Sequence, residues 1–241
     1  MRALSRLARR RLRRRLLQGG NVGSGLWGGA GPDSLTGGAY YDGIRGGRGK
    51  DTIDARGQND TIVPGGGDDF VDGGAGYDRV AFRVWKRRVV VDVRLGTATR
   101  QGAKTLVGIE DVVATNGADK LYGDGGRNAF NGLGGDDLLV GRAGGDLLCG
   151  CGGGGSDRLI GGTGVDELVA YGGKDFLIGG PGSDVLRPGE GHDRVFGRAG
   201  DDDFHARDGI QDLLFGGRGT DIGWLDRRLD ITTSIRRVRT R

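Results

Sequence analysis

A nine-residue pattern recurs along most of this chain. The segments Gly28–Thr36, Gly46–Asp54 and Gly161–Val169 each hold two glycines, a third glycine at the fourth place, an aspartate at the sixth and an aliphatic residue at the eighth. Three more segments match every one of these places: Gly73–Ala81, Gly152–Ile160 and Gly179–Arg187. Repetition at a fixed short period indicates stacked units, none of which can bury an apolar face alone. We therefore expect a solenoid rather than a globule with one thick core.

The register of this repeat can be followed through most of the sequence. Aspartate fills the sixth place in 17 of 18 units and Asn128 fills the other, so a column of carboxylates accompanies the repeat. The register stops at about Ala81 and returns at Asp119. A two-residue insertion containing Cys151 and one inserted residue before Asp212 shift it later. The pairings across both insertions stay open at this point.

Each unit predicts a glycine-rich turn of six residues followed by a short extended segment. The end of each unit has the pattern D-x-U-x, in which U is an apolar residue and x is any residue. The apolar residue points inward between two that point outward, which is the alternation of a β-strand. Successive turns and strands then form a flattened coil of two parallel sheets with a thin aliphatic filling. The 55 glycines belong in such turns, because glycine adds nothing to a core and costs backbone entropy on folding.

The charge is unevenly distributed along the chain. Residues 1–15 hold eight arginines and no acid, and residues 227–241 hold six arginines and one acid. Residues 19–226 carry 31 acidic and 22 basic residues, so the middle is acidic although the whole chain has a net charge of +4. An acidic middle suits a cation better than a nucleic acid, and no nucleic-acid partner is expected.

The kind of acid points to calcium. Of the 32 acidic residues, 29 are aspartate. Calcium is a hard cation that takes its oxygen ligands from carboxylates and backbone carbonyls. Aspartate supplies charge on a short arm, and glycine lets a turn take positive φ and aim its carbonyls into a site. The alternative is an aspartate ladder that stabilises a solenoid by hydrogen bonds alone, without a metal.

The pattern G-G-x-G-x-D-x-U-x resembles the RTX family of calcium-binding nonapeptide repeats, over roughly residues 28–224. The resemblance implies an all-β fold, namely a right-handed parallel β-roll or β-helix solenoid with a wider middle section, and several Ca²⁺ ions as cofactor. It implies that nine residues make half a coil, so that calcium lies between turns 18 residues apart on one edge. Asp33 would then share a site with Asp51, and Asp42 with Asp60 on the opposite edge.

The site residues that this resemblance implies are the sixth-place aspartates and the glycines of the best turns. The aspartates are Asp33, Asp42, Asp51, Asp60, Asp69, Asp78, Asp119, Asp137, Asp146, Asp157, Asp166, Asp175, Asp184, Asp193 and Asp202. The glycines are Gly29, Gly31, Gly47, Gly49, Gly65, Gly67, Gly162, Gly164, Gly180 and Gly182. Asn128 halves the charge of its pairing with Asp146, so calcium binding is not expected with the same strength at that site.

The two edges differ in turn quality, which predicts a difference in calcium affinity. On the edge of Asp42 and Asp60, the residues Tyr40, Ala55 and Arg56 replace glycine. We therefore expect tighter calcium binding on the edge formed by Asp33, Asp51 and Asp69. By the same comparison of turns, the edge formed by Asp166, Asp184 and Asp202 should bind calcium more tightly than the opposite edge of the later block.

Residues 82–113 interrupt the repeat. Val89, Val91, Val93 and Leu95 alternate as a strand, and "LVGIEDVV" predicts a second one. The interruption resembles segments that form wider rungs between RTX blocks, and a small separate domain is the alternative. The expected division is a basic N-terminal tail or capping helix at 1–27, a first repeat block at 28–81, the interruption at 82–113, a second block at 114–224 and a basic C-terminal cap at 225–241.

The cysteines and the N-terminal segment place few constraints on the fold or the location of the protein. Cys149 and Cys151 are separated by one residue; a bridge of that kind is strained, so free or loop thiols are expected. No stretch approaches the ~20 apolar residues that span a membrane. The first 18 residues are basic without a following apolar segment, so no recognisable Sec signal peptide is present in this sequence.

No catalytic set is visible in the sequence. The chain has no G-x-S-x-G or H-E-x-x-H motif, and His192 and His205 occupy repeat positions facing turns or solvent. We therefore expect that the chain is not an enzyme.

The expected function is that of a calcium-binding module that folds on binding Ca²⁺, in a secreted or cell-surface bacterial protein. The alternatives are a surface or adhesion scaffold whose Arg-rich ends contact an anionic surface, and the carrier part of a secreted toxin or hydrolase. We expect a monomer or part of a larger assembly.

Overall fold

The chain forms coils of short β-strands. The computed structural model describes residues 14–20, 23–82, 88–99, 102–226 and 229–239. Every helix or strand assigned among them is a strand, and the predicted parallel solenoid is confirmed. No helix long and apolar enough to cross a membrane occurs in this part of the chain. Two compact units are formed, one from Met1–Asp78 with Gln101–Gly108 and one from Arg79–Arg100 with Ile109–Arg241.

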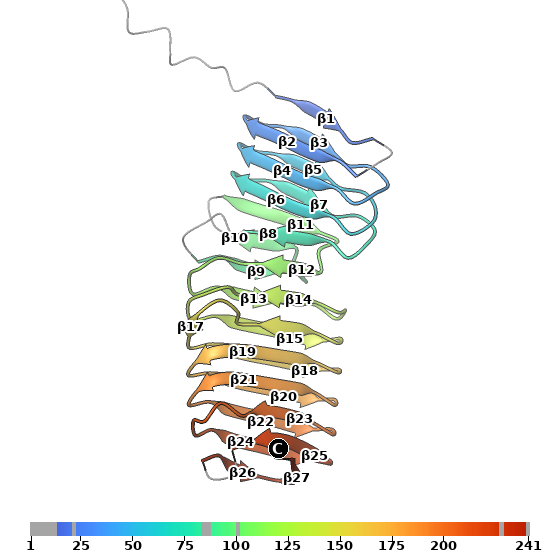
Figure 1. Cartoon of the computed structure of the whole chain (residues 1–241). Helices are drawn as coiled ribbons and strands as arrows, with labels where there is room; N and C mark the ends of the chain where they lie inside the picture. The colour runs from blue at the N-terminus through green and yellow to red at the C-terminus, as the bar shows by residue number, and fades with distance from the viewer. Residues whose placement is uncertain (1–13, 21–22, 83–87, 100–101, 227–228, 240–241) are drawn as a thin grey trace, which may run out of the picture. The chain divides into compact units, whose positions relative to one another are not determined.

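In the first unit the chain alternates between two parallel sheets (Figure 1). Leu35 pairs with Ile53 in one sheet and Ile44 with Ile62 in the other, so one coil takes 18 residues. The first sheet holds, in order, β1 (Leu16–Gln18), β3 (Ser34–Thr36), β5 (Thr52–Asp54), β7 (Phe70–Asp72) and β11 (Ala103–Val107). The second holds β2 (Gly25–Ala30), β4 (Gly43–Arg48) and β6 (Thr61–Gly66).

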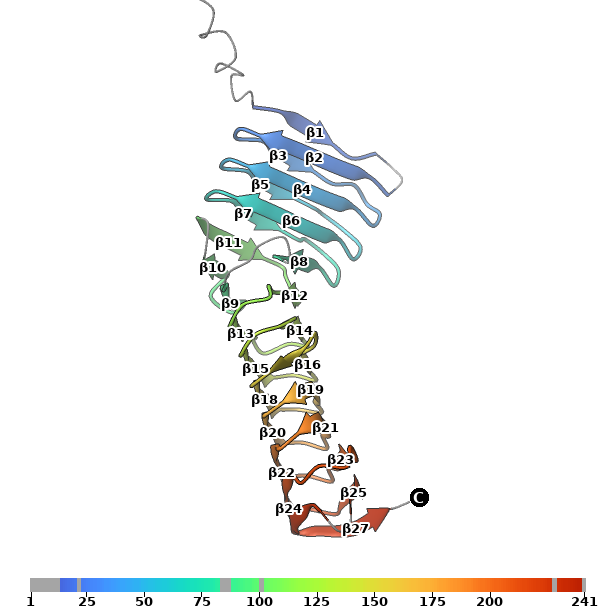
Figure 2. The same ribbon diagram turned by 60° about the vertical axis from the view of Figure 1, so that its left-hand side comes forward.

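The second unit repeats this arrangement over more coils, and its two sheets run along opposite sides (Figure 2). One sheet holds β10 (Thr97–Thr99), β9 (Val90–Asp92), β13 (Lys120–Tyr122), β15 (Leu138–Ala143), β18 (Arg158–Thr163), β20 (Phe176–Pro181), β22 (Arg194–Ala199), β24 (Leu213–Arg218) and β26 (Ile231–Thr233). The other holds β8 (Arg79–Ala81), β12 (Asp111–Val113), β14 (Ala129–Asn131), β16 (Leu147–Cys149), β19 (Glu167–Gly173), β21 (Val185–Gly191), β23 (Asp203–Ala206), β25 (Asp221–Leu225) and β27 (Ile235–Arg239), with β17 (Gly154–Gly155) beside β19. β9 and β10 pair antiparallel, whereas the other strand pairs among the described residues of this unit are parallel.

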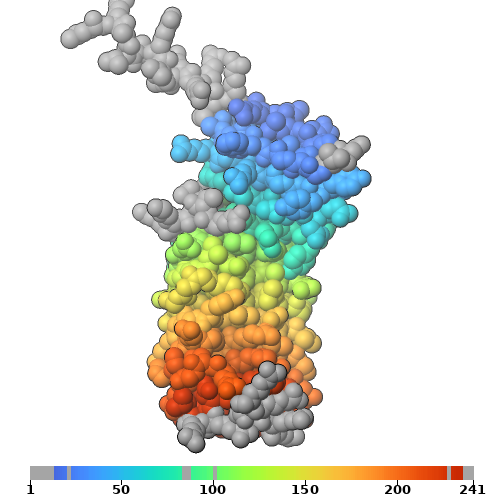
Figure 3. All heavy atoms as spheres, viewed as in Figure 1, coloured from blue at the N-terminus to red at the C-terminus, as the bar shows by residue number. Residues whose placement is uncertain are grey.

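The core of each unit is a column of single apolar side chains from facing strands. Leu35 and Ile44 in the first unit, and Leu168 and Leu177 in the second, are at most 1% exposed. Each fully buried aliphatic side chain contributes roughly 1.5–3 kcal/mol. Within each unit, successive coils follow one another as bands of colour in Figure 3. Each coil adds only a few such buried side chains to the core. The turns must therefore contribute much of what holds the coils together.

The turns depend on backbone conformations that glycine adopts most easily. Gly162 and Gly180, one coil apart, have φ of 118° and 128°. A Cβ on Gly180 would overlap the carbonyl oxygen of Gly162, so both the conformation and the close approach require glycine. At the same place in other turns, Arg56 and Tyr171 take φ of 77° and 80°. A side chain in this region costs roughly 1–2 kcal/mol, yet the turn keeps its shape.

The strand ladders extend beyond the predicted repeat blocks. β1 begins at Leu16 and pairs in parallel with β3, although residues 1–27 were expected to form a tail or a capping helix. Residues 1–13 lie outside the described part of the chain. In the C-terminal segment, β26 and β27 pair in parallel with β24 and β25. The division into repeat blocks, interruption and caps stays a prediction.

The strand predicted from Val89 to Leu95 ends earlier than expected. β9 stops at Asp92, and Val93–Gly96 form a turn in which Leu95 is 63% exposed. Asp92 Oδ1 accepts a hydrogen bond from the backbone N–H of Leu95 at 3.0 Å. A side chain that bonds its own backbone a few residues on favours a turn, which overrides the alternation of apolar residues.

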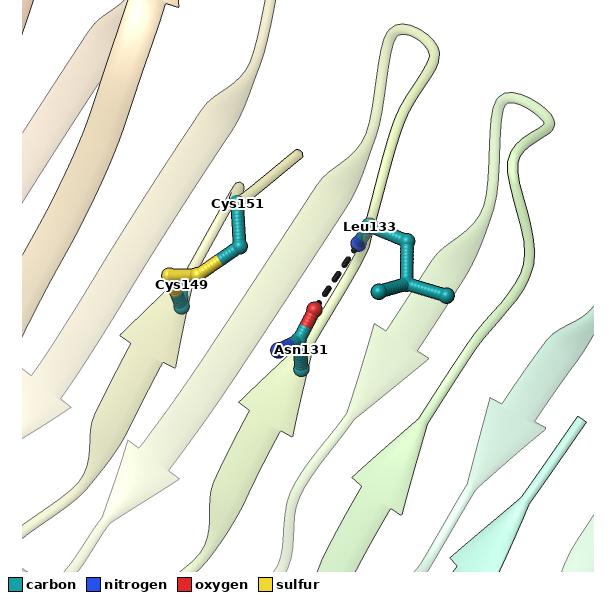
Figure 4. The surroundings of a disulfide bond; sticks show 4 residues. All are labelled: Asn131, Leu133, Cys149 and Cys151. Atoms are coloured by element: carbon teal, nitrogen blue, oxygen red, sulfur yellow. Dashed lines mark hydrogen bonds between the residues drawn. A yellow bond between two sulfur atoms is a disulfide. The ribbon is translucent and has the colours of Figure 1, made fainter. Parts of the chain in front are cut away.

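The expectation of free thiols at Cys149 and Cys151 is wrong. The two residues form a disulfide across a single glycine (Figure 4). Their Cα atoms are 5.1 Å apart, which lies within the range that disulfides bridge. Cys149 ends β16, and Cys151 takes a φ of 35° in the inserted turn, which brings the two side chains together. The backbone conformation of the insertion decided a pairing that the spacing alone disfavoured.

We expect Gly180→Ala to lower the free energy of unfolding by at least about 1 kcal/mol, because the added Cβ meets backbone in a conformation that side chains avoid. Tyr171→Gly, at the equivalent place of another turn, should not be destabilising, since it relieves that conformational cost. Urea denaturation of both variants in millimolar calcium checks this. A Gly180→Ala protein as stable as the wild type would contradict the turn geometry.

Candidate metal centre

The sixth-place aspartates of the first unit form two ladders. The backbone N–H of Asp33 donates to Oδ1 of Asp51 at 2.8 Å, and that of Asp51 donates to Oδ1 of Asp69 at 2.9 Å. We call these three residues the Asp33 ladder. The same bond, at 2.7 Å, forms the Asp42 ladder from Asp42, Asp60 and Asp78. The structure thus brings together the aspartates 18 residues apart that the resemblance paired.

The second unit carries two longer ladders that continue through both insertions. The Asp119 ladder contains Asp119, Asp137, Asp157, Asp175, Asp193, Asp212 and Asp230. The Asn128 ladder contains Asn128, Asp146, Asp166, Asp184, Asp202 and Asp221. The spacing grows to 20 residues from Asp137 to Asp157 and to 19 from Asp193 to Asp212, while both bonds stay at 2.9 Å. The inserted residues leave the hydrogen-bonded positions in register, so the pairings left open by the sequence are formed.

Most ladder aspartates use one carboxylate oxygen in this bond and leave the other buried. In eleven of them, each at most 3% exposed, Oδ2 accepts no hydrogen bond from the described residues. They are Asp33, Asp51, Asp60, Asp137, Asp146, Asp166, Asp175, Asp184, Asp193, Asp202 and Asp212. A buried carboxylate oxygen without a partner is costly, so each of these atoms is a candidate metal ligand.

The second oxygen faces a space that only a glycine leaves open. A Cβ placed on Gly28 would lie 2.7 Å from Asp33 Oδ2 and 2.5 Å from the carbonyl oxygen of Gly46, one coil further on. The described residues contain no cluster of three or more His, Cys, Asp or Glu side chains able to hold a metal. Any ion site must therefore combine carboxylate with backbone carbonyl oxygens, a set that fits calcium.

The glycines implied as ligands also line the ladders. Gly29, Gly31, Gly47, Gly49, Gly65, Gly67, Gly162, Gly164, Gly180 and Gly182 all have positive φ. The carbonyl oxygen of Gly29 faces Gly47, and that of Gly31 faces Gly49, one coil further along. On the Asp42 ladder, Arg56 and Gln58 adopt positive φ in place of glycine. The Asp60 turn thus keeps the shape of the turns on the Asp33 ladder. The difference in calcium affinity between the two ladders stays a prediction.

Some ladder aspartates have both oxygens engaged by the protein. Oδ2 of Asp42 accepts from the N–H of Gly38 at 2.6 Å. Oδ2 of Asp119 accepts from the N–H and the hydroxyl of Thr115 at 2.7 and 2.8 Å. Oδ2 of Asp69 lies 3.0 Å from Nζ of Lys104. A metal would have to compete with these contacts, so the three residues fit a cation less well than their neighbours in the ladders.

Four residues enter the ladders although they are not among the predicted metal ligands. Asp212, Asp221 and Asp230 follow one another at the repeat spacing of nine, which was the signal available for all three. Lys104 lies two residues before the inward-facing Leu106, which is the spacing of a sixth-place residue. Lysine in place of aspartate hid this last repeat within the interruption.

Burial raises the pKa of several ladder aspartates. The pKa of Asp137 is raised to about 8, and those of Asp175 and Asp202 to about 7. Loss of hydration is the largest cause; the hydrogen bond from the preceding ladder residue opposes it, and repulsion between neighbouring aspartates adds to it. A carboxyl with such a pKa holds a proton near neutral pH unless a cation stabilises its charge.

In the absence of calcium, we expect the folded chain to be more stable at pH 4.5 than at pH 8. The folded carboxyls titrate at about 6 to 8, above the 3.8 of an ordinary aspartate. The folded state therefore binds more protons than the unfolded state in this window, and its stability falls as pH rises through it. Circular dichroism of calcium-stripped protein between these pH values checks the sign. A β-sheet signal that grows with pH would contradict it.

Comparison with known proteins agrees with this geometry. A search of the curated proteins found no match to this chain. The family model of the RTX calcium-binding nonapeptide repeat matches the sequence at residues 27–62, 64–80, 109–148, 152–186 and 189–210. These segments together make up more than half of the sequence. The matched segments contain most of the ladder aspartates described above. The chain belongs to the RTX calcium-binding nonapeptide repeat family.

Proposed function

We propose that this chain is a calcium-folded, non-catalytic module of a secreted bacterial protein. The observation that carries the proposal is the set of ladder aspartates whose buried Oδ2 has no hydrogen-bond partner among the described residues. Family membership supports calcium binding in general. The proposal goes further, because it makes calcium the condition for folding.

The apolar core and the aspartate ladders make opposing contributions to folding. Most coils bury two inward aliphatic side chains, such as Leu168 and Leu177, but also two carboxylates, such as Asp166 and Asp175. Repulsion between neighbouring ladder aspartates opposes folding, as does the loss of their hydration. Bound calcium supplies positive charge to the carboxylate and carbonyl oxygens. An ion that binds only the folded state stabilises it in proportion to the logarithm of its concentration.

The expected affinity is that of an extracellular module. Such calcium sites bind at roughly 10⁻⁴ to 10⁻³ M. A chain with this affinity stays loose where calcium is scarce and folds where calcium is millimolar. This dependence suits a protein that is exported before it folds, which supports the assignment to a secreted protein.

The histidines support a non-catalytic role. His205 Nε2 lies 3.2 Å from Asp203 Oδ2, and His192 Nδ1 lies 2.9 Å from the carbonyl oxygen of Gln211. His205 thus contacts a residue of its own strand β23, and His192 contacts the turn one coil further along. Neither lies with a nucleophile in these contacts, and the periodic aspartates are accounted for by the ladders.

We expect calcium-stripped protein to show a cooperative coil-to-β transition in far-UV circular dichroism when calcium is added at neutral pH. Magnesium should not produce it, because that smaller ion demands octahedral geometry and releases its water reluctantly. Protein equally folded in a chelator would overturn calcium-dependent folding and favour a ladder held by hydrogen bonds alone.

Asp184→Asn should raise the calcium midpoint of this transition, on the order of tenfold, because it removes one charge from the Asn128 ladder while Asn keeps an acceptor for the N–H of Asp166. Asp54→Asn is the matched control. That carboxylate is about half exposed and makes a surface ion pair with Arg56, so its removal should leave the midpoint nearly unchanged. Equal midpoints in the two variants would argue against the ladder as the calcium site.

A further inference from the structure

Lys104 occupies a ladder position in the first unit. Thr105 pairs with Phe70 and Leu106 with Val71, so Lys104 lies one coil beyond Asp69. The backbone N–H of Thr105 donates to the carbonyl oxygen of Asp69 at 2.9 Å, as Phe70 does to Asp51. The interruption therefore continues the Asp33 ladder by one coil, with a cation where the other coils have an aspartate.

The Lys104 side chain turns back toward the Asp69 turn. Its Nζ lies 3.0 Å from Asp69 Oδ2, and both side chains are 0% exposed. Nζ also donates a hydrogen bond to the carbonyl oxygen of Gly67. Gly67 and Asp69 fill the fourth and sixth places of their turn. A fully buried ammonium persists only when oxygens such as these stabilise its charge.

The Asp51 turn, one coil earlier, presents the same two groups. Gly49 fills its fourth place, and the Gly49 carbonyl oxygen faces Gly67 of the next coil. Oδ2 of Asp51 is buried and accepts no hydrogen bond from the described residues. The two turns therefore differ mainly in whether the chain itself brings positive charge to the carboxylate.

We propose that Lys104 is a built-in cation that takes the place of calcium at the Asp69 turn. The Asp33 ladder then ends in a turn that is neutralised without metal, and calcium on this edge stops at Asp51. This inference rests on the proposed function, because it concerns the same kind of site. It predicts one calcium ion fewer than an uninterrupted ladder would hold.

Lys104→Asp restores the ladder residue and should bind one more calcium ion per chain than the wild type. Equilibrium dialysis in millimolar calcium, followed by elemental analysis, measures the number. Lys50→Asp is the matched control, since it makes the same charge change at an exposed residue of the Asp51 turn. The control should bind the same number as the wild type. Circular dichroism establishes that each variant is folded.

The outcomes separate this inference from the proposed function. A folded Lys104→Asp chain that binds no more calcium than the wild type overturns the role of Lys104 alone. A wild-type chain that binds no calcium overturns the proposed function, and the inference with it. An equal gain in the Lys50→Asp control shows that surface charge is responsible and also overturns the inference.

A measurement on the wild type keeps the proposal testable if Lys104→Asp fails to fold. Acetylation by a water-soluble succinimidyl ester, mapped by mass spectrometry in millimolar calcium, compares the two lysine amines directly. Lys104 should be protected, because its ammonium is enclosed by Asp69 and Gly67, whereas Lys50 should react readily. Equal rates of acetylation at the two residues would overturn the proposal.

Discussion

The hydrogen bond from one ladder aspartate's N–H to the Oδ1 of the aspartate one coil later is the interaction on which this structure depends. It sets the register of successive turns and draws a carboxylate out of water into the space between them. The bond satisfies one oxygen and leaves the other buried. The contact that aligns the coils thus also creates the demand for positive charge that a calcium ion can meet.

The rest of the coil is arranged around this bond. Glycines with positive φ let the backbone of one turn approach the next, as Gly180 does Gly162, and leave room for the second carboxylate oxygen. One inward aliphatic residue per strand closes the coil but supplies little core. Stability is therefore shared between a thin apolar column and the charge balance of the ladders, which makes the fold responsive to cations and protons.

Departures from the repeat show what the ladder tolerates. The insertion around Cys151 lengthens one turn, forms a disulfide with Cys149, and leaves the bond between Asp137 and Asp157 intact. Lys104 changes the sign of one ladder residue, and its long side chain reaches back to the neighbouring carboxylate. Inserted residues lengthen a turn without breaking the ladder, and a change of charge in one coil is balanced by a residue of a neighbouring coil. Irregular repeats therefore remain part of a regular solenoid.

The nine-residue period by itself determined the fold class and the inward residues, because both follow from spacing within a stacked repeat. The family resemblance of the repeat then paired residues such as Asp33 and Asp51. Only the tertiary structure decided which carboxylate oxygens are already engaged. Thr115 satisfies Asp119, and Lys104 neutralises Asp69 from a segment that the pattern treated as an interruption. The spacing of the repeat specifies which residues stack on one another. Which side chain contacts a given carboxylate depends on how close the folded backbone places the two residues.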